Sequence, residues 1–204
     1  MKPFPTLFAI MKPMNIQQKH VVVVGHPLSG KDTVGDYLAK EYGFAHVATG
    51  QLVRDYIAEN HLGEPTRDLM QKTGNEVRRK LGSDYFYKKA LDLNKSSDRL
   101  VINGIRTLGE VKAAKETGSI VIATVAPIEK RYEWAKARGR VSDKVSFADF
   151  VRQEEAESSS ESPYEQNVNA TTSLADYTIG NEEDLEHLYR SVDLLMSKLG
   201  VDKK

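Results

Sequence analysis

The stretch Val21-Val22-Val23-Val24-Gly25-His26-Pro27-Leu28-Ser29-Gly30-Lys31-Asp32-Thr33 decides the fold of this chain of 204 residues. Four consecutive valines are typical of a buried β-strand, because the run is short and β-branched side chains disfavour a helix. The glycine-rich segment leads directly into a helical pattern that carries Val34, Leu38 and Tyr42. Strand, glycine loop, lysine and helix is the order of a phosphate-binding loop.

The expected chemistry of this loop follows from its backbone. Gly25 and Gly30 let the chain wrap closely around an anion, and successive N–H groups and the helix N-terminus point positive dipoles at it. The alternative is a glycine turn that joins a strand to a helix by chance. Because strand and helix are both present, we expect the loop to bind ATP, with Lys31 near the β- and γ-phosphates, through Gly25, His26, Pro27, Leu28, Ser29, Gly30, Lys31, Asp32 and Thr33.

One position in the loop departs from the common motif. Serine or threonine usually follows the lysine and holds Mg²⁺. Here Asp32 occupies that position and Thr33 comes next. We therefore expect Asp32 or Thr33 to contact the metal.

Composition limits the classes of partner. Lys+Arg and Asp+Glu both number 29, so the net charge is zero, and neither polymeric nucleic acid nor a membrane is an expected partner. The chain contains no cysteine, which excludes disulfides and thiolate sites and fits a reducing, cytoplasmic setting. Residues 1–18 are expected to form a loose leader, and residues 19–204 one domain.

Further short apolar segments indicate an α/β fold. The segments are Phe44–Ala48, Leu100–Asn103, Ser119–Val125 and Ala175–Ile179. Each precedes a helical pattern, and strands that alternate with helices require a parallel sheet with right-handed crossovers.

A second candidate anion site follows the second strand. Thr49-Gly50-x-Leu52-x-Arg54 opens a helix, with Thr49 in the expected N-cap position. A hydroxyl and an arginine one turn into a helix can bind a phosphate. Alone, the same residues are more typical of an ordinary capped helix with a solvated arginine.

The next helix is expected to begin at Glu64-Pro65-Thr66-Arg67, to run to about Leu81 and to stop at Gly82. Leu69, Thr73, Val77 and Leu81 recur every four residues and are predicted to form its buried face. Arg67, Gln71, Gly74 and Arg78 form a second stripe, which either lines an acceptor pocket or is solvated. The glycine within this stripe suggests a close approach, because glycine is unfavourable inside a helix.

Polar residues continue after the third and fourth strands. Leu100–Asn103 leads into Arg106, and Thr107-x-x-Glu110 is a capping box. A basic segment, Lys130 to Arg140, carries Arg138 and Arg140 and either closes over a substrate or forms a charged surface. Ser146-Phe147-Ala148-Asp149 is expected to cap a further helix, which fades into an acidic, serine-rich run from Glu154 to Pro163. This run is expected to be mobile. Asn181 either caps the last helix with Asp184 or lies near a bound base.

Together, Gly25-x4-Gly30-Lys31 and Thr49-Gly50-x-Leu52-x-Arg54 resemble the adenylate and cytidylate kinase group of P-loop kinases. The series from Thr66 to Asp84 also resembles a set of predicted nucleotide kinases, chiefly archaeal, related to that group. The resemblance covers about residues 20 to 200. It implies a three-layer αβα P-loop NTPase fold with a parallel five-stranded sheet of order 2-3-1-4-5.

The resemblance also implies roles for particular regions and residues. Residues of about 49–93 would form the acceptor-binding region, where Thr49, Gly50, Arg54 and Arg106 hold the acceptor, together with Arg67, Gln71 and Arg78. Residues of about 131–165 would form a lid that brings Arg138 and Arg140 to the transferring phosphate. Asn181 would lie beside the adenine of ATP. Asn103 stands where the group usually has an acidic residue, which weakens the assignment of Mg²⁺.

The expected function is that of an ATP- and Mg²⁺-dependent kinase that phosphorylates a small phosphorylated acceptor, a nucleoside monophosphate. Two alternatives stay open. The acceptor can be another metabolite, such as dephospho-coenzyme A. Alternatively, the protein is a nucleotide-gated binding or ATPase module that acts on a protein partner. The sequence decides neither the base, nor ATP against GTP, nor the oligomeric state.

Overall fold

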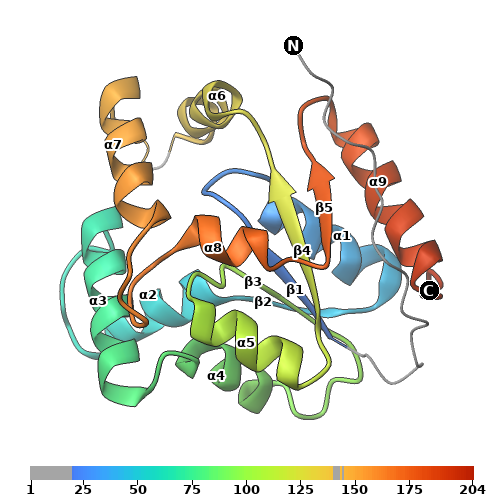
Figure 1. Cartoon of the computed structure of the whole chain (residues 1–204), viewed down its shortest axis with the longest axis horizontal. Coiled ribbons are helices and arrows are strands. Elements are labelled where there is room, and N and C mark those ends of the chain that lie inside the picture. Colours follow the sequence, from blue (N-terminus) through green and yellow to red (C-terminus); the bar gives the residue numbers. More distant parts are fainter. Residues whose placement is uncertain (1–19, 140–142, 144) are drawn as a thin grey trace.

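The computed structural model of the chain describes residues 20–139, 143 and 145–204. Its centre is a five-stranded sheet in the order β2-β3-β1-β4-β5, in which every pair of neighbouring strands is parallel (Figure 1). The strands are β1 (His20–Val24), β2 (Ala45–Ala48), β3 (Leu100–Asn103), β4 (Ile120–Val125) and β5 (Tyr177–Gly180). The predicted fold class and strand order are therefore confirmed.

The valine run of β1 packs on both faces of the sheet. Val21 and Val23 pack against α1 (Lys31–Tyr42) and α9 (Leu185–Lys198), whereas Val22 and Val24 face α4 (Tyr85–Leu93) and α5 (Leu108–Glu116). Alternate side chains of a strand point to opposite faces, so a central strand covered on both faces needs apolar residues at every position. This is why the run lacks polar alternation.

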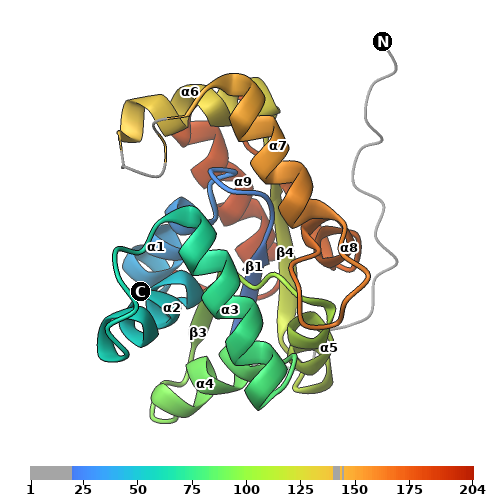
Figure 2. The ribbon, with the colours of Figure 1, turned by 90° about the vertical axis from the view of Figure 1, so that its left-hand side faces the viewer.

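The remaining helices surround the carboxyl ends of the strands. They are α2 (Thr49–Glu59), α3 (Arg67–Leu81), α6 (Ile128–Arg138), α7 (Phe147–Ser158) and α8 (Val168–Ser173). Figure 1 shows α6 beyond the arrowhead of β4, and Figure 2 shows α7 running from α6 toward α8, with α3 in front of the sheet. A third apolar cluster of Val53, Ile57, Val77 and Phe86 joins α2, α3 and α4. This cluster holds α2 and α3 at the edge of the sheet where ligands bind in open α/β folds.

Several predicted helix ends are confirmed by their caps. The Thr66 hydroxyl accepts a hydrogen bond from Leu69 N and begins α3, and Gly82 ends that helix. The capping box of Thr107 and Glu110 is complete. Ser146 caps α7 by accepting a hydrogen bond from Asp149 N.

Other local predictions are wrong. Thr49 is the first residue of α2 rather than its cap and makes no capping hydrogen bond, because Ala48 occupies the cap position. Asp184, not Asn181, caps α9, and its side chain accepts from His187 N. Leu81, expected in the buried face of α3, is 56% exposed because the helix end extends past the apolar cluster.

The first half of the acidic run is helical. Helix α7 continues into it as far as Ser158, and Glu154 and Glu157 are buried. These carboxylates are paired with arginines, so the run has a structural reason to be ordered.

In the part of the chain that the structure describes, no helix combines the length and apolar character needed to cross a membrane.

Candidate functional site

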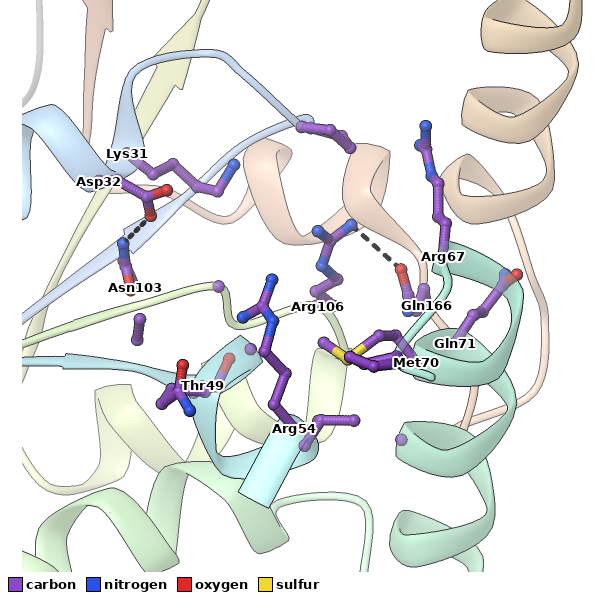
Figure 3. Close-up of a pocket in the computed structure, with 18 of the residues that line it drawn as sticks. Lys31, Asp32, Thr49, Arg54, Arg67, Met70, Gln71, Asn103, Arg106 and Gln166 are labelled. Carbon is purple, nitrogen blue, oxygen red and sulfur yellow. Dashed lines mark hydrogen bonds between the residues drawn. The ribbon is translucent and has the colours of Figure 1, made fainter. Parts of the chain in front are cut away.

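A cavity of about 430 Å³ opens at the carboxyl ends of β1, β2 and β3. Figure 3 shows the side chains of Lys31, Arg54 and Arg106 pointing into one space from three different elements. The predicted residues that line the cavity are Pro27, Leu28, Lys31, Asp32, Thr49, Gly50, Arg54, Arg67, Gln71, Arg78, Arg106 and Arg138. The structure thus places most of the predicted donor and acceptor residues around one cavity.

Some predicted residues are not among those that line the cavity. The lining does not include four loop residues, nor two others: Gly25, His26, Ser29, Gly30, Thr33 and Asn181. Arg140 lies outside the described residues.

The phosphate-binding loop is held by contacts with neighbouring strands. The Ser29 hydroxyl shares a 2.7 Å hydrogen bond with the Thr124 hydroxyl of β4, and Asn181 Nδ2 donates to the Ser29 carbonyl at 3.2 Å. Gly25 has φ +137°, and a Cβ there would lie 2.3 Å from the Thr124 carbonyl oxygen. Only glycine fits this turn. The Asn181 side chain therefore helps to hold the loop in place through this hydrogen bond.

Lys31 is buried at the base of the loop. Its Nζ donates to the His26 carbonyl at 2.6 Å, and the residue is 7% exposed. Burial, and then the positive charge of Arg106, lower the pKa of Lys31 to about 7. A phosphate anion beside this amine would favour the charged form and offset the desolvation.

Asp32 and Asn103 lie side by side where α1 begins and β3 ends. Asn103 Nδ2 donates to Asp32 Oδ1 (Figure 3). Within the described structure, the buried Asn103 Oδ1 has no hydrogen-bond partner. A buried acceptor without a donor is unfavourable, which makes this oxygen a candidate for binding a ligand or water.

Arg67 and Arg106 reach the cavity from different elements and share one carboxylate. Arg67 Nε donates to Glu157 Oε1, and Arg106 Nη1 donates to Glu157 Oε2, both at 2.6 Å. Gln153 accepts from Arg67 at 3.0 Å and Gln166 accepts from Arg106 at 3.1 Å. Burial alone would raise the pKa of Glu157, but Arg106 and Arg67 together hold it below its ordinary value. The carboxylate therefore stays charged between two guanidinium groups.

Arg78 is part of the cavity wall but is already paired. It is 3% exposed, donates to both carboxylate oxygens of Glu110 at 3.0 and 3.3 Å, and lies over the Phe86 ring. A Cβ on Gly74 would lie 3.3 Å from Arg78 Nη1, so the predicted close approach at this glycine is confirmed. Because Gly74 has no side chain, the Arg78 guanidinium can pass close to the backbone of α3.

The basic segment after β4 contains two different kinds of arginine. Arg138 lines the cavity and pairs with Asp143 through two 2.8 Å contacts. Arg131 is buried, where it donates to the Pro27 carbonyl at 3.3 Å and pairs with Glu154. Arg131 thus connects the phosphate-binding loop to α7.

The sequence analysis missed Glu157, Gln153 and Gln166 as residues of the site. A signal for Glu157 exists, because Phe150, Glu154 and Glu157 recur at intervals of four and three residues and form the buried face of α7. A helical face that places glutamates in line with a phenylalanine predicts buried, paired carboxylates. The partners of Glu157 lie 90 and 51 residues away in the sequence, so the spacing does not identify them.

Comparisons with known proteins agree with this architecture. A family model described as an AAA domain matches residues 24–149. A UPF0200 protein of Thermococcus sibiricus is 33% identical over 193 residues, which cover 90% of this chain and 97% of the relative. A UPF0200 protein of Thermococcus kodakarensis is 31% identical over 191 residues, covering 88% and 99% of the two chains.

Solved structures show the same fold at low sequence identity. A shikimate kinase from Bacteroides thetaiotaomicron superposes with a TM-score of 0.54 and 13% identity, covering 89% of this chain and 98% of that one. A putative kinase from Chloroflexus aurantiacus gives a TM-score of 0.56 and 16% identity over 91% and 98% of the two chains. With the phosphate-binding loop, the sheet order and the matched relatives in agreement, the chain belongs to the UPF0200 family and has the fold of P-loop kinases.

Proposed function

We propose that this protein is an ATP-dependent kinase that transfers the γ-phosphoryl group to a small phosphorylated acceptor, a nucleoside monophosphate. One observation carries the proposal. The buried Lys31 of the phosphate-binding loop lines the same cavity as Arg54, Arg67 and Arg106. A donor phosphate site that faces a separate group of arginines suits a reaction between two phosphorylated molecules.

The loop supplies the donor half of the proposed site. Residues Gly25 to Thr33 would surround the ATP phosphates, and the Lys31 amine would lie near the bridge between the β- and γ-phosphates. The contacts of Ser29 with Thr124 and Asn181 hold this loop in place through groups of the protein itself. Such preorganisation stabilises developing charge without reorganisation during the reaction.

Mg²⁺ is the cofactor that a P-loop kinase fold implies, and the residues beside Lys31 fit it. Asp32 provides a carboxylate, and Asn103 Oδ1 is a buried oxygen without a partner in the described structure. Because Mg²⁺ usually keeps several waters and is bound through one or two protein oxygens and the substrate phosphates, this small donor set is sufficient. Asp32 and Asn103 would hold the ion, with Thr33 as a further candidate. The ion would neutralise charge on the phosphates.

The arginines supply the acceptor half. Arg54 comes from α2, Arg67 from α3, and Arg106 from the loop after β3. With Thr49, Gly50 and Gln71, they would hold the acceptor phosphate and the group attached to it. An acceptor phosphate is already a nucleophile at neutral pH, so positioning and charge suffice and no strong general base is needed. Arg138 and Arg140 would stabilise the transferring group, and Arg78 would support the wall.

A screen of acceptors tests the proposal. ADP release from Mg²⁺·ATP is measured with single nucleoside monophosphates and with dephospho-coenzyme A. We expect release that depends on one monophosphate. Dependence on dephospho-coenzyme A instead would change the acceptor class, and release that is equal with and without every acceptor would contradict the kinase function in favour of an ATPase module.

A matched pair of arginine variants makes this test specific to the site. Arg106→Gln should raise the KM for the acceptor at least tenfold, since a charge-assisted hydrogen bond contributes about 1.5–3 kcal/mol. Arg190→Gln, on the exposed face of α9, removes the same charge outside the cavity. Arg190→Gln should leave the KM for ATP and the KM for the acceptor unchanged. Equal effects of the two variants would show that the arginine at 106 has no particular role.

A further inference from the structure

Helix α7 carries two buried carboxylates that contact opposite halves of the site. Glu154 and Glu157 are 8% and 3% exposed, whereas Glu155 between them is exposed. Glu154 pairs with Arg131, which in turn donates to the Pro27 carbonyl of the phosphate-binding loop. Glu157 pairs with Arg67 and Arg106 on the acceptor side. One helix thus connects both halves through side chains less than one turn apart.

The contacts of Glu157 leave the arginines with N–H groups to spare. Its two oxygens accept one N–H from each guanidinium, through Arg67 Nε and Arg106 Nη1. Arg67 Nη2 is buried and has no hydrogen-bond partner within the described ranges. Both side-chain hydrogen bonds that Arg106 makes to described residues leave from Nη1, so Glu157 and Gln166 do not use its Nε and Nη2 groups. A carboxylate that filled the binding site of one arginine would accept two parallel hydrogen bonds from the same guanidinium. Glu157 instead accepts one hydrogen bond from each of the two arginines.

We propose that Glu157 is a positioning residue for the acceptor: it holds Arg67 and Arg106 in one arrangement so that their remaining N–H groups converge on the acceptor phosphate. The inference rests on the proposed function, which assigns this end of the cavity to a phosphorylated acceptor. The amide oxygens of Gln153 and Gln166 complete the arrangement by accepting from Arg67 and Arg106.

Because Glu157 is charged, the proposal can be tested by asking whether its replacement strengthens or weakens phosphate binding. A carboxylate close to an anion site repels the anion, so removing its charge should strengthen phosphate binding if the charge alone mattered. If Glu157 instead orients the arginines, its removal frees two repelling guanidinium groups to separate, and phosphate binding should weaken. The two possibilities predict opposite changes for Glu157→Gln.

The experiment measures binding of inorganic phosphate by calorimetry to protein saturated with Mg²⁺ and adenylyl imidodiphosphate, which fills the donor half. We expect Glu157→Gln to weaken phosphate binding about tenfold, the loss of roughly one charge-assisted hydrogen bond. Glu155→Gln removes the same charge from the exposed face of the same helix and should change nothing. Tighter or unchanged binding in Glu157→Gln would overturn the proposal.

A second variant removes a contact that orients Arg67 and leaves the charge of the site unchanged. Gln153→Ala deletes one acceptor of Arg67, and we expect phosphate to bind about threefold more weakly, as for loss of one neutral hydrogen-bond partner. Gln153→Ala also serves if Glu157→Gln does not fold. Unchanged phosphate binding in a folded Gln153→Ala protein would count against orientation of the arginines.

Steady-state kinetics separate the roles of the two buried glutamates of α7. Glu157→Gln should raise the KM of the acceptor and leave the KM of ATP within about twofold, whereas Glu154→Gln should mainly raise the KM of ATP. Equal changes in both constants for both variants would indicate a merely structural role. Failure of the proposed function is distinguishable: no monophosphate would then stimulate ADP release, whatever the phosphate-binding results.

Discussion

At the scale of single residues, Asn103 and Asp32 are the least usual feature of the site. Replacing Asn103 with aspartate would place two carboxylates in contact, which is unfavourable unless a proton or a cation lies between them. We expect Asn103→Asp to lower the free energy of unfolding by about 1–3 kcal/mol without divalent cations, and Mg²⁺ to restore part of the loss.

Thermal denaturation with and without Mg²⁺ checks this expectation. Asn60→Asp is the control, because Asn60 is exposed and follows the C-terminal end of α2, the opposite end from Thr49. Mg²⁺ should not affect its stability. If Asn103→Asp were destabilised equally in both conditions, Mg²⁺ would not bind between these residues.

The pH dependence of stability should report on Glu157. Burial raises the pKa of Glu157, but Arg106 and Arg67 outweigh it, so the folded-state pKa lies below the ordinary value of 4.5. A carboxyl with a lowered folded-state pKa contributes stability that is present above its unfolded pKa and is lost as the pH falls through its folded pKa. We therefore expect the free energy of unfolding to fall more steeply with acidification below about pH 4.5 in the natural protein than in Glu157→Gln.

Urea denaturation across the acid range measures the two slopes. Glu155→Gln, exposed on the same helix, should keep the slope of the natural protein. Parallel curves for Glu157→Gln and the natural protein would show that the Glu157 pKa is the same in the folded and unfolded states.

At the scale of secondary structure elements, the junction between β3 and α2 depends on Gly104. Its φ is +82°, and a Cβ there would lie 2.7 Å from Thr49 Oγ1. We expect Gly104→Ala to lower the free energy of unfolding by about 2–3 kcal/mol, because backbone strain and displacement of the first turn of α2 add together. The acceptor KM should rise as Arg54 moves with that helix.

Gly63→Ala is the matched control for this prediction. Gly63 has φ +111° and no atom within 4 Å of its added Cβ, so the variant suffers backbone strain without the clash. Its loss should be about 1 kcal/mol. Equal losses measured by urea denaturation would mean that the contact with Thr49 is unimportant.

Elements with strong local signals were predictable from the sequence. The valine run required a strand covered on both faces, and Thr66, Thr107 and Ser146 marked helix starts that the structure confirms. Helices α4 and α8 were not predicted. Helix α4 begins without a side-chain cap, and α8 has six residues, too few for a clear apolar period.

The site was predictable where chain order alone brings residues together. Parallel strands end at one edge of a sheet, so Lys31, Thr49 and Arg106 had to lie near one another once the strands were assigned. Pairing between distant side chains was not predictable in this way. The acidic composition around Glu157 predicted a mobile segment. Its arginine partners come from other elements, so no neighbouring residue in the sequence identifies them. Tertiary pairing outweighed composition there.

At the scale of the whole molecule, the sheet brings a phosphate-binding loop and an arginine-lined wall to one cavity, and α7 is paired with both. The loop is held to β4 through Ser29 and Thr124, and the arginine-lined wall is joined to α7 through Glu157. A molecule that only hydrolyses ATP does not need a second anion-binding wall. The arrangement suits transfer from one phosphorylated molecule to another.

The fate of the γ-phosphoryl group tests this central claim most directly. ³¹P NMR follows Mg²⁺·ATP with the protein and the monophosphate that stimulates ADP release most. The account predicts that the γ-phosphorus of ATP becomes the β-phosphorus of a nucleoside diphosphate, and that Arg106→Gln slows this transfer while Arg190→Gln does not. Appearance of that phosphorus as inorganic phosphate, at a rate independent of every monophosphate, would contradict the account.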